Sequence, residues 1–177
     1  MSTDSNDSND SNDPNENKPA VITEARHEKA HGIVRRNSLW AAGIGAIAVP
    51  WIDILGVAGI QLKMLNEMSD VYGHEFSKNW GKFVIAALVG GLGHRTLAFG
   101  VLASTLKAIP GIGSLFGALT VPIFSGAVTY AIGHVFVMHF ESNGTFLNFD
   151  PKKLQAEFNK AFEAGKAFVS AEATTTP

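Results

Sequence analysis

The chain has 177 residues, with 14 Lys and Arg against 16 Asp and Glu, and a formal net charge of −2. This length suits about one domain, and the near-neutral balance lacks the basic surface with which proteins bind nucleic acid. There is no cysteine, which excludes disulfides, thiolate metal sites and cysteine nucleophiles.

Charged and apolar residues are distributed unevenly along the chain. Residues 39–140 hold 4 of the 16 acidic residues, 5 of the 14 basic residues and 15 of the 18 glycines. Of these 102 residues 59 are apolar, a larger share than the roughly 45–50% of a typical soluble domain. Residues 39–141 are therefore predicted to form a helical membrane domain.

The N-terminal part of the chain is polar. Residues 1–19 repeat Ser-Asn-Asp and are predicted to be a disordered acidic tail. Residues 20–38 form a charged segment whose last basic residues are Arg35 and Arg36. Since basic residues beside an apolar run stay inside the cell, this segment predicts a cytoplasmic N-terminus.

The first apolar run, residues 39–62, is interrupted by Pro50 and Asp53. The pattern predicts a short helix to about Val49, a break, and a second helix that begins with Asp53 as its N-cap and ends before Gly73. The interruption favours a re-entrant or interfacial segment over one unbroken span.

Two longer apolar stretches follow, and we expect them to form a transmembrane hairpin. The arms are residues 83–106 and 113–140, each long enough to cross a bilayer, and Pro110-Gly111 supplies the turn between them. The second arm contains a G-x-x-x-G motif and further small residues, and the glycines expected to support helix packing are Gly113, Gly117, Gly126 and Gly133. Packing within the hairpin is favoured, and self-association into a homo-oligomer or pore stays open.

The C-terminal part predicts one amphipathic helix. Asp150 and Pro151 supply an N-cap and a first helical residue, and apolar residues recur on one face through residues 150–170. This face can lie on a membrane surface or pack on the rest of the chain. Residues 171–177 are predicted to be a disordered tail.

No catalytic, cofactor or metal site is predicted. The chain has no P-loop, no G-x-S-x-G and no H-E-x-x-H motif, and its six histidines are scattered. The polar residues that stand out inside the apolar runs are Asp53, His94 and Arg95. A buried cation is costly in a membrane, so Arg95 is expected to pair with Asp53 or with backbone carbonyls, ahead of a role in transport. A further alternative is that residues 83–106 form two short helices with His94 and Arg95 at their junction.

The middle of the chain resembles the YcjF-like family of bacterial helical domains, known as domain of unknown function 697. The resemblance covers roughly residues 39–141 and is carried in chain order by Pro50-Trp51-Ile52-Asp53, Gln61-Leu62-Lys63-Met64, Val71-Tyr72-Gly73, Gly90-Gly91-Leu92-Gly93, Ile109-Pro110-Gly111-Ile112-Gly113-Ser114 and residues 126–133. It implies an α-helical, membrane-associated domain that is often fused to a GTPase or encoded beside one. It implies no catalytic residues, and a GTPase partner would be a separate chain.

The sequence therefore predicts an all-α, glycine-rich membrane-associated bundle with a transmembrane hairpin and a C-terminal amphipathic helix. The expected role is a non-enzymatic anchor, scaffold or regulator for a GTPase-like partner, in a bacterial inner membrane with a cytoplasmic N-terminus. Two alternatives remain: a small self-assembling pore or transport-type protein, and a soluble helical domain that buries residues 108–140 and contacts membranes reversibly.

Overall fold

The computed structural model describes residues 18–46, 52–92 and 113–175, and every regular element in these ranges is helical. In chain order the elements are α1 (Lys18–Gly45), α2 (Ile52–Tyr72), α3 (Lys78–Gly90), α5 (Gly113–Glu141), the short 3₁₀ helix η1 (Phe146–Asn148) and α6 (Pro151–Thr175). The prediction of an all-α fold is confirmed.

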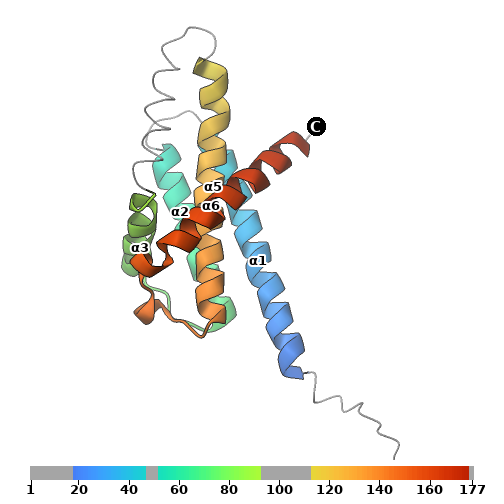
Figure 1. Cartoon of the computed structure of the whole chain (residues 1–177), viewed down its shortest axis with the longest axis vertical. Helices are drawn as coiled ribbons and strands as arrows, with labels where there is room; N and C mark the ends of the chain where they lie inside the picture. The colour runs from blue at the N-terminus through green and yellow to red at the C-terminus, as the bar shows by residue number, and fades with distance from the viewer. Residues whose placement is uncertain (1–17, 47–51, 93–112, 176–177) are drawn as a thin grey trace, which may run out of the picture.

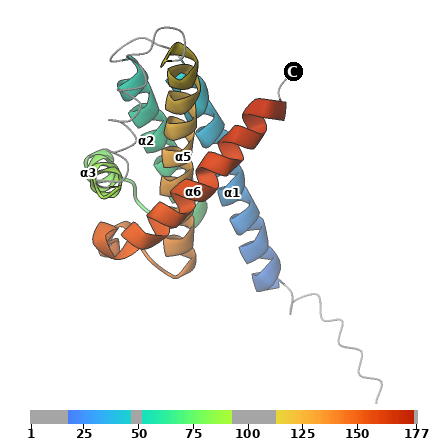
Figure 2. The same cartoon turned by 45° about the horizontal axis from the view of Figure 1, so that its top comes forward.

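The central element is α5, with α1 and α2 beside it and α6 crossing it obliquely (Figures 1 and 2). No charged residue occurs in α5 before Glu141. A helix that is apolar on every side needs neighbours on every side, and α5 packs against α1, α2, α3 and α6. Its Val121–Glu141 stretch is, among the described residues, the one long and apolar enough to cross a membrane by length and composition, although most of it is buried within the fold.

Close packing between α1 and α5 depends on glycine. A Cβ built on Gly133 would lie 2.6 Å from Val34 Cγ2, and one on Gly126 would lie 3.0 Å from the backbone oxygen of Ser38. Val34 is itself buried and β-branched, so its side chain has little freedom to move aside. Gly126 and Gly133 therefore lie in contacts within the chain, where they allow two helix backbones to approach each other.

An aromatic cluster closes the end of the bundle where α5 runs into η1. The rings of Phe136 and Phe149 are stacked with centroids 4.3 Å apart, and Trp80 of α3 meets Phe146 edge to face at 4.9 Å. Such pairs contribute about 0.5–1.5 kcal/mol beyond their buried area. They tie α3, α5 and the loop before α6 together.

The predicted ends of two helices agree with the structure. Gly73 follows α2 with a positive φ of 72°, the left-handed conformation that glycine adopts readily. Asp150 accepts a hydrogen bond of 3.0 Å from the Lys152 amide, and α6 begins at Pro151. Asp53 differs slightly, because α2 already begins at Ile52 and Asp53 lies inside its first turn.

The first arm of the expected hairpin needs correction. The structure has α3 from Lys78 to Gly90, with Gly91 as its C-cap, and not one helix from residue 83 to residue 106. Two consecutive glycines each cost about 1 kcal/mol in a helix relative to alanine, which explains the end. Residues 93–112, including the Pro110-Gly111 turn, lie outside the described residues.

The charged segment is helical, and the C-terminal tail is more ordered than expected. Residues 20–38 belong to α1, which continues without interruption across the boundary at residue 39. They contribute Ala30, Val34 and Asn37 to the buried interior. At the other end α6 continues past residue 170 to Thr175, where the Thr174 and Thr175 hydroxyls donate to the Ala171 carbonyl.

A glycine pair in the same fold tests the close α1–α5 contact. Gly133→Ala is expected to destabilise the chain by about 1–3 kcal/mol, because the new methyl group overlaps Val34. Gly32→Ala is the control, since its Cβ meets nothing within 4 Å, and replacing a helical glycine with alanine there should stabilise by about 0.5–1 kcal/mol. Denaturant unfolding followed by circular dichroism measures both; equal effects would contradict the packing described.

Candidate functional site

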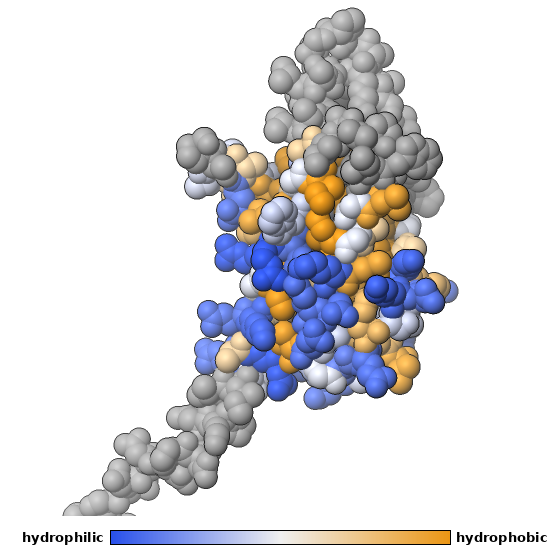
Figure 3. All heavy atoms as spheres, turned by 180° about the vertical axis from the view of Figure 1, so that it is seen from behind, coloured by the Kyte–Doolittle hydropathy of each residue, from blue (hydrophilic) through white to orange (hydrophobic). Residues whose placement is uncertain are grey.

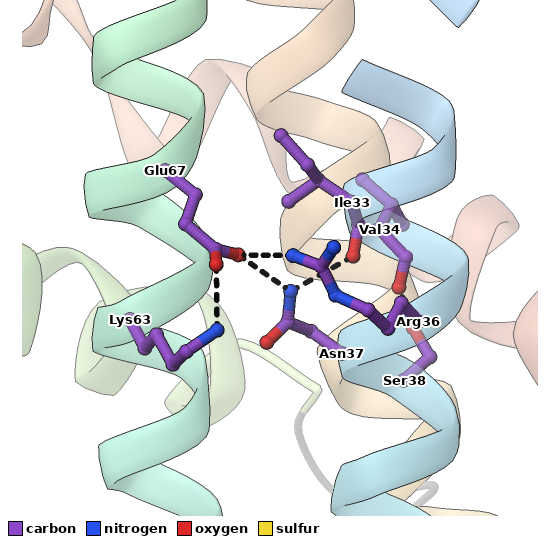
Figure 4. A network of polar contacts seen from close by, with 7 residues as sticks. All are labelled: Ile33, Val34, Arg36, Asn37, Ser38, Lys63 and Glu67. Carbon is purple, nitrogen blue, oxygen red and sulfur yellow. Dashed lines mark hydrogen bonds and ion pairs between the residues drawn. The ribbon is translucent and has the colours of Figure 1, made fainter. Parts of the chain in front are cut away.

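A polar network links the second half of α1 to the second half of α2 (Figure 4). The Glu67 carboxylate accepts hydrogen bonds from Arg36 and from the Asn37 amide, both at 2.9 Å, and from Lys63 at 2.6 Å. Asn37 also donates to the Ile33 carbonyl at 2.9 Å. The buried amide is thus satisfied by its own helix and by a carboxylate of the next.

The surroundings of Glu67 favour its ionised form. Burial on its own raises the pKa of this carboxyl, but the hydrogen bonds from Lys63 and Asn37 and the charge of Arg36 outweigh it, so the pKa lies below its ordinary value. A carboxyl whose pKa is lower in the folded state stabilises the fold above its unfolded pKa and loses that contribution as the pH falls through its folded pKa.

A second polar group joins α1, α2 and α5 near the end of α5. Glu141 accepts from the Tyr72 hydroxyl at 3.0 Å and lies 2.6 Å from His27 Nδ1. The ring centroids of His27 and His31 are 4.3 Å apart, and His134 lies 6.2 Å from His31. Burial lowers the pKa of His31, and the neighbouring histidines lower it further. Burial, then Glu141, raises the pKa of Tyr72.

These side chains do not form a metal site. Within the described ranges no three His, Asp or Glu side chains gather in a way that could hold a metal ion. The histidine group is an interhelical contact in which His27 of α1 pairs with Glu141 of α5.

Beyond the Glu67 network the bundle has an uncharged end. Arg36 is the last charged residue of α1, and Lys63 is the first of α2 after Asp53, whose side chain lies outside the described part. Because both bond to Glu67, the last charged residue of α1 and Lys63 of α2 lie at the same level. We call the part of the bundle beyond this level the uncharged end, in which Asp53 is the one charged residue of the described parts of α1, α2 and α5. From there α1 continues to Gly45, while α2 continues back toward Ile52.

Large apolar side chains are exposed at this uncharged end. Trp40 of α1 is 65% exposed and Leu55 of α2 is 73% exposed. The apolar residues exposed there on three helices are Leu39, Trp40, Leu55, Val121 and Phe124. Figure 3 shows apolar residues in the upper part of one face and along its right-hand edge, with hydrophilic residues over much of the middle and left of that face. Large exposed apolar patches are typical of surfaces that contact a membrane or another protein.

The residues singled out from the sequence are placed only in part. His94 and Arg95 lie outside the described residues, so their pairing with Asp53 stays a prediction. Gly113 and Gly117 lie in the first turns of α5, whereas Gly126 and Gly133 contact α1 as described above. The Glu67 network was not predicted from the sequence. Two local patterns could have indicated it: the adjacent Arg36 and Asn37 on α1, and the i,i+4 pair of Lys63 and Glu67 on α2.

Comparisons with known proteins identify relatives but no matching solved structure. Residues 10–166 match the family model described as Domain of unknown function (DUF697). Magnetosome membrane protein 22 of Magnetospirillum gryphiswaldense is 36% identical over 152 residues, which are 86% of this chain and 78% of that protein.

Removing the carboxylate tests the α1–α2 link. Glu67→Gln should destabilise the fold by about 1–2 kcal/mol near neutral pH, because three donors lose a charged acceptor. Asp70→Asn, an exposed change one turn away on α2, should stay within about 0.5 kcal/mol.

The same pair of proteins gives a pH test with a defined sign. Since the folded pKa of Glu67 is lowered, the stability difference between the natural chain and Glu67→Gln should shrink as the pH falls through the acidic range below the ordinary pKa of a glutamate. Chemical unfolding at a series of pH values measures it. A difference that grew toward low pH would contradict an ionised Glu67 in the network.

Proposed function

This chain belongs to the family described as domain of unknown function 697, and on that premise we propose that it is a non-enzymatic, membrane-associated helical protein. It anchors, scaffolds or regulates a GTPase-like partner on a separate chain. The observation that carries the membrane part is the uncharged end of the bundle, where Trp40 and Leu55 are exposed next to α5.

A bilayer is the contact that this end fits best. Exposed apolar residues on α1, α2 and α5 lie on one side of the Glu67 network, while the other side carries the His27–Glu141 group and the charged first half of α1. If the uncharged end enters the bilayer, the charged end can remain in water. Burial of the exposed apolar side chains is then favourable by about 25 cal/mol for each Å² of apolar surface removed from water.

One relative also supports membrane association. The protein from Magnetospirillum gryphiswaldense is named a magnetosome membrane protein, and the sequence resemblance implies membrane association for the family. We extend this to a location at a bacterial inner membrane with the N-terminus in the cytoplasm, since Arg35 and Arg36 directly precede the uncharged end of α1.

The GTPase-like partner is supported by the family resemblance and by the residues available. The chain has no P-loop sequence of its own, and a G-x-x-x-x-G-K-[ST] loop is what cradles nucleotide phosphates in such enzymes. In-cell crosslinking followed by mass spectrometry should recover a chain that has this loop and binds GTP; recovery of partners that all lack nucleotide binding would contradict this part.

The pore alternative is less well supported by the described residues. Self-association through small residues needs them free on a helix surface, but Gly126 and Gly133 are covered by α1 and, at Gly126, also by Val169 of α6. Arg95, which motivated a transport role, lies outside the described residues. A homo-oligomer would have to use other surfaces.

Vesicle flotation tests the membrane contact directly. The full chain should float with phospholipid vesicles, and Trp40→Gln or Leu55→Gln should each weaken partitioning by about tenfold or more, because burying such a side chain gains about 1.5–3 kcal/mol. Both residues are exposed, so the free energy of unfolding should change by less than about 0.5 kcal/mol.

Leu147→Gln is the matched control for these two variants. Leu147 is 96% exposed but lies in η1, between the end of α5 and the start of α6. Its replacement should leave flotation unchanged. If all three variants lost binding equally, or if the natural chain stayed with the soluble fraction, the assignment of the uncharged end to a membrane would be overturned.

A further inference from the structure

Three cationic side chains lie on the surface of the bundle next to its uncharged end. Arg36 and Lys63 flank Glu67 on α1 and α2, and Arg35 points toward α6, where it pairs with Glu172 at 3.6 Å and stands 5.3 Å over the Phe168 ring. We call Arg35, Arg36 and Lys63 the cation belt. It follows the surface from α6 across α1 to α2.

The cationic side chains of the belt are more exposed than the carboxylates with which they pair. The three cationic side chains are 63%, 52% and 60% exposed, whereas Glu67 and Glu172 are 27% and 43% exposed. A surface that meets the belt therefore encounters guanidinium and ammonium groups before carboxylates. Phosphate groups are the matching ligands, because guanidinium binds them through paired hydrogen bonds.

Trp40 extends this pattern toward the uncharged end. It lies one helical turn beyond Arg36 on α1 and is 65% exposed, and Leu55 is exposed on the neighbouring helix. A cation, then a tryptophan, then aliphatic side chains is the order in which proteins meet headgroups, the interface and the hydrocarbon of a bilayer. The order argues for a lipid surface over a protein groove.

From these observations we infer that the cation belt binds the headgroups of anionic phospholipids and that the α1–α2 pair dips into one leaflet as a re-entrant hairpin. The inference rests on the proposed membrane association and adds the lipid class and the depth.

Helix lengths set the depth of the dip. At about 1.5 Å per residue, α1 rises about 14 Å from Arg36 to Gly45, and α2 falls about 16 Å from Ile52 to Lys63. The hydrocarbon core of a bilayer is about 30 Å thick. With the belt held at the headgroups, the described ends of both helices reach about the midplane, and the chain returns to the side from which it entered.

The lipid class is tested by flotation titrations of the full chain. Vesicles of phosphatidylcholine alone are compared with an equal mixture of phosphatidylcholine and phosphatidylglycerol. The double variant Arg35→Gln with Lys63→Gln should bind the mixed vesicles about 30-fold more weakly than the natural chain, which is about 2 kcal/mol at about 1 kcal/mol per basic residue and ~1.4 kcal/mol per tenfold. The Arg36–Glu67 contact remains in this variant.

Two further variants control for charge and for folding. Lys152→Gln with Lys153→Gln removes two exposed cations from the first turn of α6, at the opposite end of that helix from Glu172, and should leave binding nearly unchanged. Arg35→Lys with Lys63→Arg keeps the charges and should restore binding. If the double glutamine variant does not fold, the salt dependence of the natural chain tests the same point. Its affinity for mixed vesicles should fall as the salt concentration rises.

The depth is tested by single cysteines, since the chain has none. A fluorophore on Leu55→Cys should be quenched most by lipids labelled deep in the acyl chain, and a reductant trapped inside the vesicle should not reach it. The same fluorophore on Leu147→Cys should remain accessible from outside.

The outcomes separate this inference from the proposed function. Equal binding to neutral and mixed vesicles, with no effect of the double glutamine variant, overturns the anionic-headgroup belt but leaves membrane association standing. Reaction of the Leu55→Cys label with the trapped reductant shows a full crossing and overturns the re-entrant hairpin. Absence of binding to both kinds of vesicle refutes membrane association itself and leaves a protein partner as the occupant of the apolar end.

Discussion

The packing of α1 against α5 is the contact on which the rest of the structure depends. α5 has no charge before its last residue, so every side of it needs cover, and α1 approaches closely because Gly126 and Gly133 carry no side chain. Once these two helices are joined, α6 completes the cover through Gly165, whose position lies against the Ala127 backbone. α2 then reaches α1 through the Glu67 network and α5 through the Gln61–Thr129 hydrogen bond.

This arrangement divides one bundle into two environments. Toward η1, aromatic stacking and the His27–Glu141 group close the end of the bundle at which the charged first half of α1 begins. Toward the start of α5, the described helices have no charge except Asp53 at the beginning of α2, and Trp40 and Leu55 are exposed. This division supports the proposed membrane contact, because a bilayer would remove the exposed apolar side chains from water while the charged end stays hydrated.

Local signals predicted the helices well where chemistry acts within a few residues. The Gly73 stop and the Asp150-Pro151 start could be read directly, because capping depends on neighbours in sequence. Which helices pack against each other could not be predicted in this way. The charged segment 20–38 contributes to the core because Val34 contacts Gly133 of another helix, and the periodicity of one helix does not indicate such a contact. The end of α3 at Gly90 was not predicted, because the arm was inferred from the length of the apolar run and the two consecutive glycines inside it were not given weight. In the proposed site, the basic residues Arg35 and Arg36 could be identified from the sequence. Their proximity to Lys63 and Glu67 became clear only from the three-dimensional structure.

Hydrogen–deuterium exchange of the full chain, with and without mixed phosphatidylcholine and phosphatidylglycerol vesicles, would show which helices enter the bilayer. We expect vesicles to slow exchange at the uncharged ends of α1 and α2, around residues 39–46 and 55–60, and to leave exchange in η1 and the first turns of α6 unchanged. Protection confined to α6 and η1, or no change anywhere in the described helices, would contradict the claim that the uncharged end of this bundle enters the membrane.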